Sequence, residues 1–188
     1  MKKSVFLLLT LCLNIPVFGQ TILTDEVNSK GERTIATSMD IARDFKDKEV
    51  FSVGLSALQV DDLEQLFLCI KVTSLEPYTI KAGAVLLIKS TNNEVLTLNA
   101  FTDYDASVRE VHNVNNYVFS DYSTIAMYPI TKEQIASLSR GVIKIRQETF
   151  GGTHDKEYKK DKMGILIQKD YELLTSALKK KKNIYDGF

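Results

Sequence analysis

Short runs rich in Val, Ile, Thr, Phe and Tyr recur along this chain at intervals of about 10 residues, and Gly, Pro, Asn, Asp or Ser residues separate them. Such spacing is typical of a β-rich domain whose strands are joined by turns. The sequence predicts two antiparallel hairpins, one over Ala84–Phe101 and one across the junction Phe150–His154. The predicted strands are Glu32–Thr37, Val50–Ala57, Gln65–Thr73, Ala84–Lys89, Glu94–Phe101, Tyr117–Ser120, Thr124–Tyr128, Val142–Thr149 and Lys156–Lys159.

The run from Gln65 to Thr73 predicts which of its side chains face the core. Residues two apart share a face of a strand, so Leu66, Leu68, Ile70 and Val72 form one apolar face and the opposite face is mixed. Cys69 belongs to the mixed face of this apolar run, and we expect a buried structural thiol there rather than a nucleophile.

Two segments carry helical patterns. Thr131 and Gln134 form a capping box, and Gly141 stands where a left-handed residue ends a helix, which predicts a short helix at about 132–139. Apolar residues at helical spacing from Ile167 to Leu178 predict a C-terminal amphipathic helix at about 162–180. The predicted fold class is therefore α+β, a mostly antiparallel sheet or sandwich with one inserted helix and a second helix packed on the sheet.

The N-terminus has the pattern of a secretory signal peptide. Lys2 and Lys3 precede a short apolar run, Pro16 follows it, and small Gly19 stands before Gln20. The apolar run is shorter than the ~20 residues that a membrane span needs. We expect residues 1–19 to be cleaved, and residues 20–188 to form a single exported domain with a lysine-rich tail, in the periplasm or at the cell surface.

Composition limits the classes of partner. The 188 residues contain 24 Lys plus Arg and 24 Asp plus Glu. The chain therefore lacks the excess of basic residues that is typical of nucleic-acid-binding proteins. Removal of the signal peptide leaves one cysteine, Cys69, so no internal disulfide can form in the mature chain. The mature chain is also predicted to contain no transmembrane segment.

Motifs that would dictate a chemistry are missing from the sequence. Two histidines and one mature cysteine make no zinc pattern, and no glycine-rich phosphate loop occurs. Ser56 lacks the second glycine of a nucleophile elbow, and the run from Asp103 to Ser107 lacks the glycine and glutamate of a calcium loop. The sequence thus predicts no catalytic residue, no cofactor site and no metal site.

Binding candidates come from the aromatic stretch and from one loop. Tyr104, Tyr117 and Tyr122 lie near several asparagines, a mixture that suits contact with a peptide or a glycan, and His154 follows two glycines. The predicted function is non-enzymatic binding or assembly in the cell envelope, with an envelope protein or a glycan as partner, through an exposed sheet edge or the aromatic stretch.

Two alternatives stay open at this point. One is a small secreted hydrolase that uses paired carboxylates, or His154 with an acid. The other is contact with an anionic membrane surface through the run Lys179 to Lys182.

One block of sequence carries a resemblance. Tyr128–Ile135, followed by Gly141–Arg146 and Glu148-Thr149, together with the signal-peptide ending Phe18-Gly19-Gln20, resembles small uncharacterised secreted proteins of Gram-negative gut anaerobes. The resemblance implies export to the periplasm or the cell surface, and it implies no activity.

Overall fold

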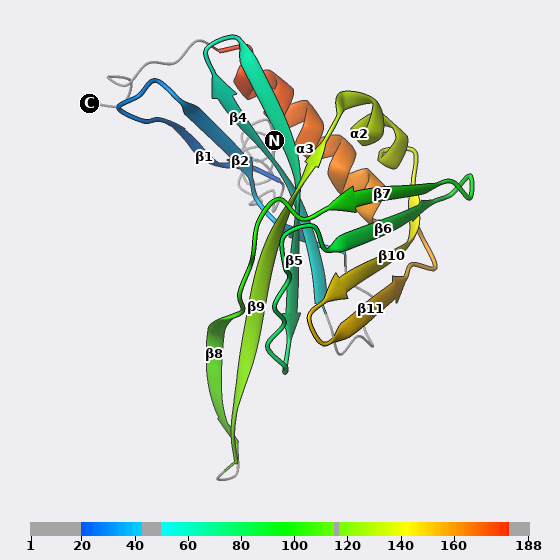
Figure 1. Ribbon diagram of the computed structural model, residues 1–188. Helices are drawn as coiled ribbons and strands as arrows, with labels where there is room; N and C mark the ends of the chain where they lie inside the picture. Colours follow the sequence, from blue (N-terminus) through cyan, green and yellow to red (C-terminus); the bar gives the residue numbers. More distant parts are fainter. Residues whose placement is uncertain (1–19, 43–49, 115–116, 181–188) are drawn as a thin grey trace, which may run out of the picture.

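The computed structural model describes residues 20–42, 50–114 and 117–180, which form two antiparallel sheets and two helices (Figure 1). The larger sheet has the strand order β1-β2-β4-β5-β9-β8, with β3 paired to β4, and the smaller has the order β11-β10-β6-β7. The predicted α+β, β-rich fold class is confirmed. The strands of the larger sheet are β1 (Ile22–Val27), β2 (Arg33–Thr37), β3 (Asp40–Ile41), β4 (Val50–Val60), β5 (Leu63–Ser74), β8 (Ser107–Val114) and β9 (Tyr117–Ile130). Those of the smaller sheet are β6 (Val85–Ser90), β7 (Val95–Asn99), β10 (Val142–Thr149) and β11 (Gly152–Glu157).

The core lies between the two sheets and α3 (Met163–Leu178). Leu66, Leu68, Ile70 and Val72 of β5 are all buried in it, as their alternation predicts. Buried Tyr128 of β9 donates a hydrogen bond of 2.6 Å to Oε1 of Gln147 on β10, so a satisfied polar pair connects the sheets inside the core.

Cys69 lies on the opposite face of β5 and is buried, as expected. Burial raises the pKa of its thiol, and the Ser56 hydroxyl lies 3.4 Å away. A protonated thiol is a poor nucleophile, so this placement agrees with a structural cysteine.

The helix α2 (Lys132–Leu138) begins with the predicted capping box. The Thr131 side chain accepts from the Gln134 backbone N–H, and the Gln134 side chain accepts from the Thr131 backbone N–H. Gly141, just beyond the helix, has a φ of +132°, a region that favours glycine.

The helix α3 packs against β1, β2 and β4 and against α2 (Figure 1). Carbonyl groups at and just beyond its C-terminus accept hydrogen bonds from buried Arg33 of β2, at 3.0 Å to Ala177 O and 2.7 Å to Lys180 O. Arg33 also makes a bidentate ion pair with Asp25 of β1, which ties the edge of the large sheet to the helix end.

Several strand boundaries differ from those predicted. The strands β1, β3 and β8 were not predicted, and β9 is one strand of 14 residues where two short runs were expected. β11 runs from Gly152 to Glu157, so the turn after β10 is confined to the residues before Gly152. The predicted strand Lys156–Lys159 therefore begins too late. β1 and β8 contain many polar residues, and only pairing with a neighbouring strand makes such segments extended.

Candidate functional site

The strand β8 and the first part of β9 form a hairpin that projects from the body of the protein (Figure 1). We call residues 107–114 and 117–123 the arm. A register shift between Val108 and Glu110 places Val108 opposite Tyr122 and Glu110 opposite Asp121. Such a bulge re-aims side chains, and here it gives the arm two chemically different faces.

The first face of the arm is apolar and exposed. Val108, Val111 and Val118 lie on it with exposed fractions of 59%, 61% and 68%. Tyr122, opposite Val108, is half-buried on the same face. Exposed aliphatic residues grouped on one surface are typical of an interaction site.

The arm also ends the larger sheet, because β8 is an edge strand. It is 8 residues long, whereas the other edge strands, β1, β7 and β11, have 6, 5 and 6 residues. An edge strand offers backbone N–H and C=O groups for pairing with another chain. Of these edges, β8 is thus the longest template for an added strand.

The second face of the arm is polar. His112 Nε2 lies 3.1 Å from Asp121 Oδ2 and 3.9 Å from Glu110 Oε2. One potential ligand atom from each of these three residues lies within 4.8 Å of the other two. His112 and Asp121 are half-buried and Glu110 is exposed, so a small cation can reach all three groups.

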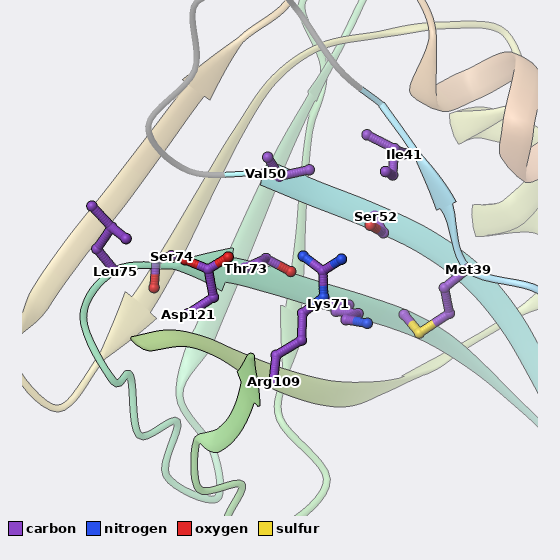
Figure 2. Close-up of a pocket in the computed structure, with 10 residues that line it drawn as sticks. All are labelled: Met39, Ile41, Val50, Ser52, Lys71, Thr73, Ser74, Leu75, Arg109 and Asp121. Atoms are coloured by element: carbon purple, nitrogen blue, oxygen red, sulfur yellow. The ribbon is translucent and has the colours of Figure 1, made fainter. Parts of the chain in front are cut away.

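An open pocket of about 390 Å³ lies at the base of the arm, on the same side as the polar face (Figure 2). Arg109 of the arm reaches toward β4 and β5, and Lys71 of β5 also lines the space. No ion pair is formed by either cation with the described residues. The other lining residues are Met39, Ile41, Val50, Ser52, Thr73, Ser74, Leu75 and Asp121.

Two of the three predicted tyrosines, Tyr104 and Tyr122, lie in different parts of the structure. Tyr104 is half-buried, bridges to Ile80, and donates its hydroxyl to Met127 O at 3.3 Å. Tyr122 lies in the arm, and Tyr117 begins β9 with a side chain outside the described residues. Tyr104 thus packs on the body, apart from the strand surface that carries Tyr122.

His154 lies within β11 rather than at a hairpin tip. Its ring lies 4.0 Å from the ring of Tyr78, centroid to centroid. The neighbouring Asp155 accepts from Arg146 at 2.6 Å and lies 3.2 Å from Lys144, and these cations hold the pKa of its carboxyl far below the usual value. Because adjacent residues of a strand point to opposite faces, this geometry does not favour an acid–base pair of His154 with Asp155.

The C-terminal lysine run is only partly described. Lys179 and Lys180 are exposed just after α3, whereas Lys181 and Lys182 lie outside the described residues, as does the predicted signal peptide. In the described part of the chain, no helix is both long enough and apolar enough to span a membrane.

Sequence reasoning missed His112 and the two acids beside it. The signal present in the sequence was Glu110 and His112 at a spacing of two, which places both on one face of a strand. Asp121 joins them only through the hairpin register, and β8 itself was not predicted.

Comparison with known proteins does not assign a function to this geometry. No protein-family model, no curated protein and no solved structure matches the chain. The function therefore has to be argued from the arm and the pocket at its base.

Proposed function

We propose that this protein is an exported, non-enzymatic binding or assembly protein of the cell envelope, and that the β8 edge of the arm pairs with an extended segment of a partner protein. The N-terminal pattern of Lys2, Lys3, an apolar run and Gly19 supports export. The arm supports the binding role.

The observation that carries the proposal is the combination of a long edge strand with an exposed apolar face. Added strands gain affinity from backbone hydrogen bonds and specificity from side chains at alternate positions. Val108 and Val111 are exposed on β8, and Val118 is exposed across from it on β9. An incoming strand with apolar residues at every second position would extend this surface.

A protein segment fits the arm better than a glycan does. Glycan sites use the flat faces of aromatic rings, whereas the largest exposed side chains on the arm's apolar face are those of Val108, Val111 and Val118, and Tyr122 on that face is half-buried. The hydroxyl of Tyr104 is used in a hydrogen bond within the body of the protein. We therefore commit to a protein partner and treat a glycan as an alternative outcome of the test.

The test is site-specific photo-crosslinking in cells that produce the full chain. A photoreactive residue at Val111 is expected to give one discrete adduct with an envelope protein, and Val108→Lys should abolish that adduct because a lysine on the edge strand opposes pairing. Val95 of β7, which is 57% exposed on another edge strand, is the matched control position.

The outcomes separate the alternatives. Equal adducts at Val111 and Val95, or an adduct that survives Val108→Lys, would overturn the proposed role of β8. Retention on an envelope-glycan column that persists in Val108→Lys would favour a glycan partner instead. The mass of the recovered protein checks cleavage before Gln20.

A further inference from the structure

We propose that Glu110, His112 and Asp121 form a binding site for one divalent transition-metal ion, with Zn²⁺ as the best-suited ion. The site lies on the polar face of the arm, so this inference does not depend on the proposed partner at the β8 edge.

The first argument is geometric. Zinc bound by imidazole nitrogen and carboxylate oxygen has ligand distances of about 2.0–2.2 Å, so two tetrahedral ligands lie about 3.3 Å apart. His112 Nε2 and Asp121 Oδ2 share a hydrogen bond of 3.1 Å, which is close to this separation and which a bound ion would replace. Glu110 Oε2 lies 3.9 Å from the same nitrogen, and the exposed glutamate side chain can move closer to both other ligand groups by rotation.

The second argument is electrostatic. The hairpin register places Glu110 directly opposite Asp121, and like charges in directly opposite positions destabilise a pair of strands. A cation between the two carboxylates converts this repulsion into attraction. An imidazole ligand carries no negative charge, so His112 can supply a third ligand at the same point without adding to the repulsion.

The ligand set selects the class of metal. Mg²⁺ and Ca²⁺ prefer oxygen ligands alone, whereas imidazole with carboxylates suits Zn²⁺ and other first-row transition ions. Three protein ligands leave one tetrahedral position for water or for a ligand group. Asp121 also lines the pocket that contains Lys71 and Arg109, so an anionic group in the pocket is a candidate for that position.

Zinc titration of the purified full chain, made without a polyhistidine tag, tests the proposal. Every variant also carries Cys12→Ser, so that this cysteine cannot bind the added zinc. The other cysteine of the chain, Cys69, is buried. We expect one Zn²⁺ per chain by calorimetry. His112→Asn and Asp121→Asn should each weaken binding at least about tenfold, since even residues that only support ligands change metal affinity by about 10–100-fold.

The chain provides its own matched control, because it contains two histidines. His154→Asn should leave the zinc affinity unchanged. In imidazole ¹⁵N spectra, zinc should shift the resonances of His112 and leave those of His154 in place. Ca²⁺ and Mg²⁺ in the same titration should compete at least tenfold more weakly than Mn²⁺ or Zn²⁺.

Three results would overturn the assignment: no shift of the His112 resonances, zinc affinity unchanged by His112→Asn in a folded variant, or binding lost equally in His154→Asn. Circular dichroism of each variant establishes that the variant is folded.

Discussion

Asp170 of α3 places an ionisable carboxyl group in the interior of the protein. Its side chain is fully buried, and among the described residues no group lies in hydrogen-bonding geometry with either of its oxygens. Burial raises its pKa to about 7, the nearby Thr37 side chain opposes the rise, and the charge of Asp40 adds to it. As the pH rises, the unfolded chain, with a pKa near 3.8, therefore releases this proton at a much lower pH than the folded protein does.

A pH dependence of stability follows. Between pH 3.8 and about 7 the folded state binds the extra proton, so Asp170 makes the free energy of unfolding decrease as the pH rises, by up to about 1.4 kcal/mol per pH unit. Above about pH 7 the contribution is constant. Asp170→Asn should remove this slope, and urea unfolding at pH 5 and pH 7 measures it.

The control for this measurement is Asp62→Asn, because Asp62 is exposed. It should keep the slope of the unaltered protein. An equal slope in Asp170→Asn and in the unaltered protein would contradict the assignment of this pH dependence to Asp170.

At the scale of elements, α3 begins in close contact with the end of α2. Asp161 Oδ1 accepts from the backbone N–H groups of Gly164 and Val142, at 2.8 and 3.0 Å. A Cβ atom added to Gly164 would lie 2.7 Å from Leu138 O and 2.8 Å from the Cα of Gly141. Glycine is therefore needed at this position for contact with backbone atoms rather than for its conformational freedom.

Gly164→Ala should destabilise the protein by about 1–3 kcal/mol, because the contact with backbone atoms outweighs the ~1 kcal/mol by which alanine favours a helix. Thermal or urea unfolding gives the value. Ser176→Ala, on the exposed face of the same helix, should be neutral or slightly stabilising. A stabilised Gly164→Ala would show that α3 can move away from α2 at little cost.

Elements with local signals were the ones that could be predicted. The capping box of Thr131 and Gln134 acts within one turn, so the short helix was predicted to within one residue of its end. β8 has no such local signal: Arg109, Glu110, His112 and Asn113 interrupt its apolar residues, and its partner is needed to make it a strand. Glu110 and His112 lie on β8 and meet Asp121 only through its pairing with β9. The proposed metal site could therefore not be predicted from the sequence either.

At the scale of the whole molecule, the arm lies outside the hydrophobic core. The buried cluster includes Ala126, Tyr128 and Ile130 from the far end of β9, and among the described residues it includes none from β8. At its base the arm is joined to β5 through the pairs of Tyr122 with Ser74 and of Ser123 with Thr73, and beyond them its own hairpin hydrogen bonds hold it.

Substitutions in the arm should therefore leave global stability nearly unchanged. Val118→Ser is expected to alter the free energy of unfolding by less than about 0.5 kcal/mol, as for other surface changes. Leu68→Ala, in the centre of β5, should cost about 2–5 kcal/mol. A cost above 1 kcal/mol for Val118→Ser in urea unfolding would place the arm within the cooperative core.

The sequence by itself determined the β-rich class, the buried face of β5, the buried thiol of Cys69 and the short helix after Thr131. These features depend on side-chain alternation and on contacts within a few residues, which the order of residues expresses directly. Only the tertiary structure decided that Glu110 stands opposite Asp121, that Arg33 binds the end of α3, and that Asp170 is buried. Each of these depends on strand register or on the docking of distant segments, and no local pattern specifies either of them.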